Sequence, residues 1–439
     1  MQNPRQLAFE ALIKTEKDGA YSNIALDFLL SKSDCDTRDR AFVSNLFYGV
    51  IERKITLDYQ IELYLSKPIN KLKKDVLTVL RLGAYQILFM DKVPSSAAVN
   101  ESVNIAKKNG LSYASGLVNA VLRKIDKNGL ILPSEENFTD YLSVLYSCPT
   151  WLINKWIKEY GKEDTEGILK SSVDVCKNYI RVNNTLISEN ELIDELKSEG
   201  VEAAKTLYNN CLEIQLGGRS VESLKSFING YFHVQDAACQ LCAKALNVKP
   251  GDRVFDLCAA PGGKTYTVAE EMNNSGEVLS FDIHEHRVKL IKKGAERLKL
   301  TCVKPTAGDA TSFYENLGEA DAVLCDVPCS GFGIIGRKPE IKYKNPDEVK
   351  QLPSLQLQIL QTGAKYVKAG GRLVYSTCTL SHSENSKVCK RFLQSTDDFK
   401  VVSPFKDLSD DEFLTLMPHK HCTDGFFIAC FERKKQNEN

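Results

Sequence analysis

The sequence predicts an α/β protein in three parts: an all-helical N-terminal region, a small α+β middle region and a C-terminal doubly wound sheet. Three observations predict this fold class. Apolar residues recur with helical spacing over residues 1–130, strand-like and helix-like segments mix over 145–235, and strands alternate regularly with helices over 236–435. A chain of 439 residues also exceeds one ordinary core, so several domains are expected.

The N-terminal region is predicted to be a helical bundle. Segments such as PRQLAFEALIKTE and LKKDVLTVLRLGAYQILFM place apolar residues on one face every ~3.6 residues. The bundle could hold the chain together, or it could bind RNA through basic side chains, and charge alone favours the first role. The candidate basic residues are Arg38, Arg40, Arg53, Lys54, Arg123 and Lys124.

The middle region combines three predicted strands, YIRVN, CLEIQL and GYFHVQ, with two predicted helices, SENELIDELKSEG and SVESLKSF. The order of these segments is typical of a small ferredoxin-like or RRM-like unit. The region lacks the aromatic motifs on which RNA bases stack, so direct base reading is not supported.

The C-terminal region alternates five short apolar strands with helices. The strands are RVFDLCA, GEVLSFD, VKPTAGDA, DAVLCDVP and GRLVYSTCT, and the clearest helices are EHRVKLIKKGAERLKL and PSLQLQILQTGAKYVKAG. We expect the basic charges of the first helix to lie on a solvated outer face. The alternation predicts a mostly parallel sheet whose ligands bind at the carboxyl ends of its strands.

The amino-acid composition limits which cellular compartment and which classes of function are expected. Lysine plus arginine equals aspartate plus glutamate at 57 each, which argues weakly against a non-specific binder of polyanions. We expect neither a leader nor a membrane span, because no charged-then-apolar start and no apolar run near ~18 residues is seen, and fourteen cysteines suggest free thiols in a reducing, cytoplasmic compartment. We expect no metal site, because Cys239 and Cys242 form the only CxxC and no second pair stands nearby.

The stretch VFDLCAAPGGKTY ends in Gly-Gly-Lys-Thr, like a phosphate-binding loop. Such a loop needs a glycine six residues before its lysine, but Cys258 stands six residues before Lys264, and Pro261 removes a backbone donor. A nucleotide hydrolase is therefore disfavoured. The stretch instead predicts a strand, a tight turn and a helix from Lys264 onward, with a ligand against the N-terminus of that helix.

Two carboxylates stand at the ends of the next two strands: Asp282 is the last residue of VLSFD, and Asp309 directly follows VKPTAG. An acidic residue about twenty residues beyond a glycine turn suits the ribose hydroxyls of an adenosine, and Asp309 could accept from an adenine amino group. Either residue alone could be a helix cap, but the two together indicate an adenosine-type cofactor.

Cys329 in LCDVPCSG and Cys378 in LVYSTCTLS each follow an apolar strand, so both should face one cleft together with Asp326. Most cysteines only pack, yet these two lie on turns, where even a small thiolate fraction is strongly nucleophilic. One coherent target is C6 of a pyrimidine, because addition there would activate C5 to take a methyl group.

The motifs DLCAAPGGKT, DVPCSG and YSTCT resemble those of the NOL1/NOP2/Sun family of RNA cytosine-5 methyltransferases, which use S-adenosyl-L-methionine. RLGAYQILFMDKVPSSAAVNESVNIAKK and GLVNAVLR resemble the NusB-like RNA-binding domain of the bacterial 16S rRNA enzymes of the RsmB (Sun/Fmu) type. The resemblance covers essentially the whole chain. It implies domains at 1–130, 145–235 and 236–435, a Rossmann-like catalytic sheet, and methyl transfer to C5 of a cytosine in 16S ribosomal RNA, naked or in an assembling small subunit.

The resemblance also implies roles for residues. Cys378 matches the nucleophile, Cys329 the cysteine that assists product release, and Asp326 the acid that holds the cytosine edge. Lys264 is expected near both cofactor and base, and Arg337 with Lys338 matches a basic loop that meets RNA phosphate. The implied cofactor-binding residues are Cys258, Ala259, Ala260, Pro261, Gly262, Gly263, Lys264, Asp282, Asp309 and Asp326.

Two alternatives stand beside this hypothesis. One is a cytosine-5 methyltransferase for transfer RNA or 23S rRNA, and the other is a non-catalytic RNA-binding assembly factor on the same fold. Any of the catalytic hypotheses requires the target base to leave its stack, so that it can reach both the thiol and the methyl donor.

Overall fold

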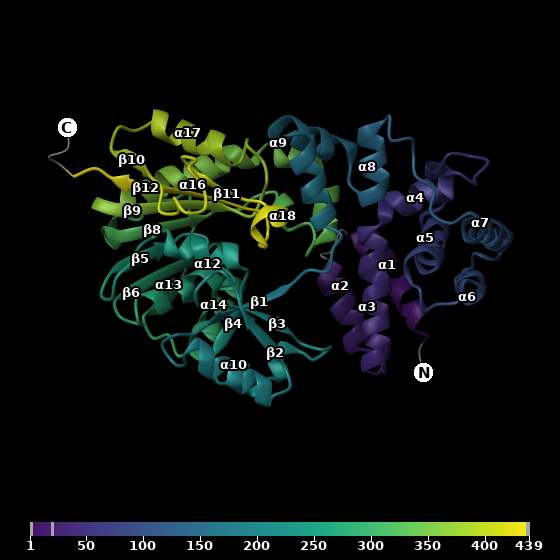
Figure 1. The fold of residues 1–439 in the computed structure, drawn as a ribbon, viewed down its shortest axis with the longest axis horizontal. Coiled ribbons are helices and arrows are strands. Elements are labelled where there is room, and N and C mark those ends of the chain that lie inside the picture. The colour runs from purple at the N-terminus through teal and green to yellow at the C-terminus, as the bar shows by residue number, and fades with distance from the viewer. Residues whose placement is uncertain (1–2, 19–21, 436–439) are drawn as a thin grey trace. The chain divides into compact units, whose positions relative to one another are not determined.

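The computed structural model describes residues 3–18 and 22–435 and divides into two compact units (Figure 1). Unit 1 comprises Met1–Val173 and Lys338–Tyr343, and unit 2 comprises Asp174–Arg337 and Lys344–Asn439. The predicted fold class is confirmed: the N-terminal region is helical, a small α+β sheet follows it, and a larger mixed sheet with helices forms the C-terminal region.

Unit 1 is built from helices, and those within residues 4–128 surround one apolar core. In α5, for example, the residues that recur with helical spacing, Val76, Val79, Leu80 and Gly83, are all buried. The helices are α1 (Pro4–Asp18), α2 (Ser22–Ser31), α3 (Thr37–Glu52), α4 (Lys54–Glu62), α5 (Lys74–Phe89), α6 (Ser95–Lys108), α7 (Ser115–Asn128), α8 (Phe138–Tyr146) and α9 (Thr150–Ser171). Within residues 3–18 and 22–435 no helix is long and apolar enough to cross a membrane.

The segment Lys338–Tyr343 folds as part of unit 1, although its neighbours in the chain on both sides belong to unit 2. Lys342 donates from Nζ to the Glu52 carbonyl at 2.8 Å, and the Tyr343 hydroxyl donates to the Ile51 carbonyl at 3.0 Å. The Lys342 side chain is 1% exposed, and burial lowers its pKa to about 8. The segment Lys338–Tyr343 therefore places a buried lysine against the carboxyl end of α3.

The smaller sheet of unit 2 has four strands in the order β2-β3-β1-β4, and all neighbours are antiparallel. Its strands are β1 (Asn178–Val182), β2 (Glu202–Lys205), β3 (Cys211–Gln215) and β4 (Phe232–Val234), and its helices are α10 (Glu189–Ser198) and α11 (Lys225–Ile228). The predicted capped helix is α10, which begins with a capping box between Ser188 and Glu191.

The larger sheet has eight strands, seven of them in the order β10-β12-β9-β8-β5-β6-β7, with β11 paired to β12. The five predicted strands are β5 (Arg253–Asp256), β6 (Glu277–Asp282), β7 (Val303–Ala307), β8 (Ala320–Asp326) and β9 (Val367–Thr377), and all run parallel. Three further strands, which were not predicted, add an antiparallel edge: β10 (Phe399–Val402), β11 (Leu414–Leu416) and β12 (Phe426–Arg433).

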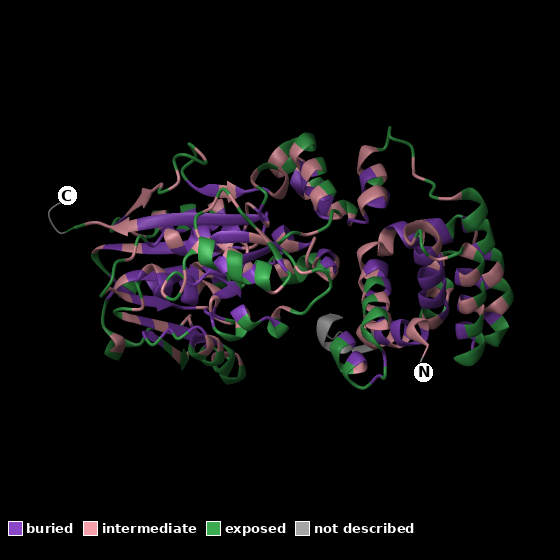
Figure 2. Ribbon diagram, turned by 60° about the horizontal axis from the view of Figure 1, so that its bottom comes forward, coloured by how far each residue is buried: buried purple, intermediate pink, exposed green. Residues whose placement is uncertain are grey.

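Helices cover both faces of this sheet, whose strands are buried while the outer helix faces are exposed (Figure 2). They are α12 (Ala237–Lys244), α13 (Gly263–Glu271), α14 (Glu285–Arg297), α15 (Pro346–Val349), α16 (Leu352–Tyr366), α17 (Ser386–Gln394) and α18 (Pro418–His421). In α14, Lys289, Lys292 and Lys293 are exposed, as expected for a solvated basic face.

A buried ion cluster anchors the smaller sheet to the larger one. Arg181 on β1 is fully buried and donates to Glu270 at 3.1 Å and to Glu271 at 2.7 Å. Both glutamates end α13, the helix that begins at the glycine turn. The smaller sheet thus fixes one end of the helix whose other end faces the candidate site.

Candidate active site

The candidate site lies at the carboxyl edge of the larger sheet. The chain runs from β5 to β6 and β7 on one side, and then to β8 and β9 on the other, so the strand order reverses at β5. Ligands of doubly wound sheets bind at such a reversal, outside the carboxyl ends of the strands. Polar or thiol side chains follow the strands there: Asp256, Asp282, Asp309, Asp326 and Cys378.

The turn from Cys258 to Lys264 connects β5 to α13 as the sequence predicts. Gly262 is the residue before α13 and has a φ of 113°, a conformation that favours glycine. A Cβ there would lie 2.3 Å from the Tyr266 ring, so only glycine fits. Burial raises the pKa of the Cys258 thiol well above its usual value, and the side chain packs against the core around Phe255.

Lys264 and Asp326 form the central charged pair. The Lys264 ammonium donates to Asp326 Oδ2 at 2.8 Å, and the Ser376 hydroxyl donates to Asp326 Oδ1 at 2.7 Å. Burial opposes the charge of Lys264, but Asp326 and the thiols of Cys239 and Cys242 outweigh it and raise the pKa of Lys264 well above its usual value. Both oxygens of Asp326 are thus fixed by donors.

Asp256 lies beneath this pair at the end of β5 and is 1% exposed. The Thr265 hydroxyl donates to its Oδ2 at 2.7 Å. Burial raises the pKa of Asp256 to about 7, and the nearby charge of Asp326 adds to the effect.

The structure brings the two predicted cysteines into contact. Cys329 follows β8, Cys378 follows β9, and their Sγ atoms lie 3.3 Å apart. Both thiols are partly exposed. The hydrogen bond with Cys378 and then burial raise the pKa of Cys329 well above its usual value. The two sulfurs therefore form one hydrogen-bonded pair at the edge of the sheet, in which either thiol can be the donor.

Asp282 and Asp309 lie at neighbouring strand ends but already have partners. Asp282 is 5% exposed, accepts from the His284 amide at 3.0 Å and pairs with Arg287 at 3.0 Å. Asp309 accepts from the amide and hydroxyl of Thr311 at 2.8 Å and 2.7 Å. Both carboxylates therefore stand in the expected places, and each also caps its own loop.

Arg337 and Lys338 have different environments. The Arg337 guanidinium donates to Asp424 at 2.7 Å and to Asp236 at 3.2 Å, so carboxylates already hold it. Lys338 is exposed. Contact of this loop with RNA phosphate stays a prediction.

Three contacts of the site were not predicted. Cys239 accepts from Lys264 Nζ at 3.4 Å, and burial raises its pKa to about 12. The Phe426 ring lies 5.1 Å from Lys264 Nζ. Arg287 donates to the Ala260 carbonyl at 2.9 Å and so joins the glycine turn to Asp282. Cys239 lies in HVQDAACQ, shortly after the predicted strand GYFHVQ, but nothing in the sequence connects β12 to the site.

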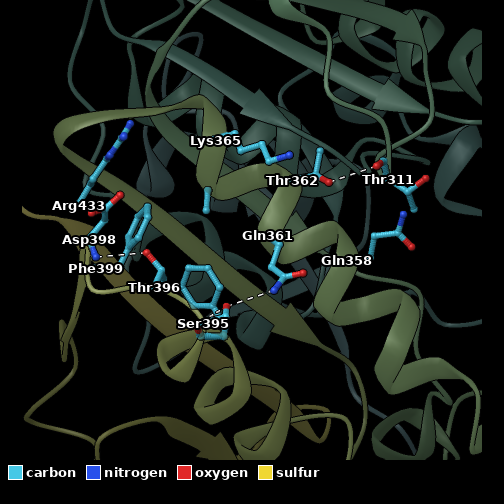
Figure 3. A pocket seen from close by; sticks show the side chains of 12 residues that line it. Thr311, Gln358, Gln361, Thr362, Lys365, Ser395, Thr396, Asp398, Phe399 and Arg433 are labelled. Atoms are coloured by element: carbon cyan, nitrogen blue, oxygen red, sulfur yellow. Dashed lines mark hydrogen bonds between the residues drawn. The ribbon is translucent and has the colours of Figure 1, made fainter.

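A pocket of about 460 Å³ elsewhere in unit 2 is separate from this site (Figure 3). It lies along α16 and the segment after α17, where Gln361 donates to Ser395 at 3.1 Å and Lys365 and Arg433 line the wall. None of the predicted site residues lines it. Across the part of the chain that the structure describes, no group of three or more His, Cys, Asp or Glu side chains could hold a metal ion.

The sequence matches known families over nearly all of its length. Residues 243–432 match the family described as 16S rRNA methyltransferase RsmB/F, residues 2–127 the NusB family, and residues 148–218 the ferredoxin-like domain of RsmF/B-like methyltransferases. The middle match supports the ferredoxin-like reading of the smaller sheet.

Two curated relatives share this arrangement. The probable ribosomal RNA small subunit methyltransferase B of Bacillus subtilis (strain 168) is 39% identical over 446 residues, with 98% of each chain covered. The ribosomal RNA small subunit methyltransferase B of Escherichia coli O1:K1 / APEC is 31% identical over 439 residues, with 99% of each chain covered.

Two solved structures have the same fold. The crystal structure of PH0851 has a TM-score of 0.82 at 28% identity and covers 99% of both chains. NSun6 from Pyrococcus horikoshii with SFG has a TM-score of 0.60 at 25% identity, covering 66% of this chain and 100% of that one. The family match and the curated relatives, which align over the whole length, agree with each other. The chain therefore belongs to the RsmB/F family of 16S ribosomal RNA methyltransferases.

Proposed function

We propose that this chain transfers a methyl group from S-adenosyl-L-methionine to C5 of a cytosine in 16S ribosomal RNA, through a covalent bond between Cys378 and C6 of the base. The observation that carries the proposal is the pair of thiols at the ends of β8 and β9, whose Sγ atoms lie 3.3 Å apart. Two thiols in one cleft supply both a nucleophile and a proton donor.

Residues at the same edge fit an adenosyl cofactor. The turn Cys258–Lys264 leads into the N-terminus of α13, and the Asp282 carboxylate stands at the end of β6. Asp309 lies at the next strand end and lines a small crevice with Leu257 and Phe281. S-adenosyl-L-methionine bound there would supply an electrophilic methyl group.

The side chains of the site provide for each step on the cytosine. The Cys378 thiolate adds to C6, which makes C5 nucleophilic, and C5 then takes the methyl group. A base or a water molecule removes the C5 proton, the C6–S bond breaks, and Cys378 leaves as a thiolate. Asp326, held by Lys264 and Ser376 through both oxygens, is suited to hold the N3 or N4 edge of the base throughout.

Cys329 is suited to assist the release of Cys378. The Cys329 and Cys378 sulfurs lie 3.3 Å apart in a hydrogen bond that either can donate, and this contact and burial raise the pKa of Cys329 well above its usual value. Cys329 would therefore keep its proton and donate this hydrogen bond to the Cys378 sulfur as the C6–S bond breaks. Cys378 leaves as a thiolate stabilised by Cys329, and the cycle ends with Cys378 free of the RNA.

The substrate assignment is supported by the relatives' names, which specify the small ribosomal subunit. We propose that residues 1–130 form the RNA-binding domain, 145–235 the ferredoxin-like domain and 236–435 the catalytic domain, and that the enzyme acts in the cytoplasm. The target cytosine must be extruded or lie in a loop, since both its faces are needed for the chemistry.

The test is to incubate the full chain with S-adenosyl-L-methionine carrying a labelled methyl group and with 16S rRNA, naked or in small subunits, from cells lacking the enzyme. We expect label at one cytosine of 16S rRNA, which becomes resistant to bisulfite. Label confined to transfer RNA or 23S rRNA would assign that RNA as the substrate in place of 16S rRNA. No label on any RNA would support a non-catalytic assembly factor.

A further inference from the structure

Glu384 is a fully buried carboxylate between β9 and α17, and it is not one of the predicted site residues. Its Oε2 accepts from the Ser330 amide at 2.8 Å, its Oε1 from the Ser330 hydroxyl at 2.6 Å, and Gln356 donates to Oε2 at 3.1 Å. Among the described residues no lysine or arginine pairs with it. Burying a carboxylate costs free energy unless hydrogen-bond donors satisfy its oxygens. These three donors therefore stabilise Glu384 in its buried position.

These contacts connect Glu384 to both cysteine turns. Ser330 directly follows Cys329, and Gln356 also donates to the Pro328 carbonyl at 3.0 Å, so both neighbours of Cys329 are held. The Ser330 hydroxyl gives its proton to Glu384 and therefore accepts from the Thr379 hydroxyl, which lies 2.7 Å away. Thr379 directly follows Cys378. One hydrogen-bonded chain thus runs from the second turn through the first to Glu384.

The next residue, Asn385, completes the arrangement from the side of Cys378. The Thr377 hydroxyl donates to Asn385 Oδ1 at 2.6 Å, and Asn385 Nδ2 donates to the Thr379 carbonyl at 2.8 Å. Thr377 and Thr379 flank Cys378. All of these polar groups are buried, so water does not compete for their hydrogen bonds and the turns have little freedom to separate.

We propose that Glu384, with Asn385, is a positioning residue that sets the separation of the Cys329 and Cys378 sulfurs and so couples formation of the RNA adduct to its release. Neither residue touches the base. The catalytic part of this inference rests on the proposed roles of the two cysteines, whereas the structural part, the fixed sulfur separation, does not. The two parts can therefore be tested separately.

The structural part is tested on the full chain without RNA or cofactor. Diamide takes two protons and two electrons from a pair of thiols, and it yields a disulfide and the reduced hydrazine. The rate at which Cys329 and Cys378 become linked, followed by mass spectrometry of peptides, reports how closely the sulfurs are held. We expect Glu384→Gln to slow this linkage about tenfold, because the amide replaces one of the two oxygens that accept from Ser330 with an NH2 donor.

Glu270→Gln is the matched control, because Glu270 is equally buried but contacts Arg181 on the smaller sheet. Its linkage rate should equal that of the parent chain. Thr379→Val is a second variant, which removes only the hydroxyl link between the turns, and it should slow linkage less. If Glu384→Gln does not fold, an unchanged rate in Thr379→Val overturns the proposal, and a slowed rate supports it.

The catalytic part is tested by turnover of 16S rRNA. Glu384→Gln should lower kcat about tenfold or more with little change in the KM for RNA, and it should accumulate covalent protein–RNA adduct. In a Cys329→Ala background the same substitution should add little, because the release step is already lost. Parent-like linkage in Glu384→Gln overturns the positioning role, whereas slowed linkage in a chain that never methylates RNA overturns only the proposed function.

Discussion

The Lys264 ammonium lies 2.8 Å from the Asp326 carboxylate. Lys264 is in the first turn of α13, and Asp326 is the last residue of β8. The pair thus connects the glycine turn on one side of the strand reversal to the first cysteine turn on the other. The side chains are only 13% and 27% exposed, so the attraction between them is weakly screened.

Lys264→Met should destabilise the protein by about 3 kcal/mol, because it leaves the Asp326 charge without its cation. The double variant Lys264→Met with Asp326→Asn should recover most of that stability but no methyl transfer, since neither charge remains to hold the base. Urea unfolding and labelled methyl transfer measure the two effects. Parent-like stability of Lys264→Met would show that the pair contributes nothing to the fold.

Gly262→Ala should weaken both the fold and cofactor binding. Its φ of 113° and the Tyr266 ring 2.3 Å from the new Cβ together should cost about 2–3 kcal/mol. Gly263→Ala is the control for stability, because its Cβ meets nothing closer than 3.5 Å and its backbone is helical. Urea unfolding should separate the two variants, and equal stability would mean that the turn tolerates a side chain. Titration of Gly262→Ala and the parent chain with S-adenosyl-L-methionine measures the loss of binding.

Because of Asp256, the free energy of unfolding should decrease as pH rises. Its pKa of about 7 in the folded protein exceeds the ~3.9 of an unfolded aspartate, so the folded state binds the proton more tightly. The stabilisation is complete below about pH 4 and is lost towards pH 7, by up to about 4 kcal/mol. Asp256→Asn keeps an acceptor for Thr265, and the difference in unfolding free energy between parent and variant should follow this curve. A difference independent of pH would mean that Asp256 is charged in the folded protein.

Lys342 should have the opposite dependence. Burial lowers its pKa to about 8, below the ~10.4 of an unfolded lysine, so the unfolded state binds the proton more tightly. The parent should therefore gain stability relative to Lys342→Met as pH rises from about 8 to about 10, by up to about 3 kcal/mol. Thermal unfolding at several pH values measures the gain, and a constant difference would show that Lys342 is charged when folded.

Much of the fold could be predicted because strand and helix periods are local properties of the sequence. The five parallel strands were recognisable from short apolar runs between helices. The antiparallel edge was missed although FFIACF in β12 is a continuous apolar run, because a short apolar run alone does not distinguish a strand from a buried helix segment. β2 has the sequence EAAK, which is a poor strand former, and only its pairing with β3 makes it a strand.

The site could be predicted in part for the same reason. Cys329, Cys378 and Asp326 follow recognisable strands, and parallel strand ends must meet at one edge. The contacts that hold them could not be predicted, because they join distant residues: Glu384 lies 54 positions from Ser330 and reads in SHSENS as an exposed polar loop. Burial of such a residue follows from packing of the whole domain, not from its local sequence.

The central claim is that Cys378 forms the bond to RNA and that Cys329 releases it. The most direct measurement is denaturing gel electrophoresis of Cys378→Ala and Cys329→Ala after incubation with labelled 16S rRNA and S-adenosyl-L-methionine. Cys329→Ala should accumulate a covalent protein–RNA adduct, while Cys378→Ala should form no adduct and transfer no methyl group. Adduct formed by Cys378→Ala would contradict the account.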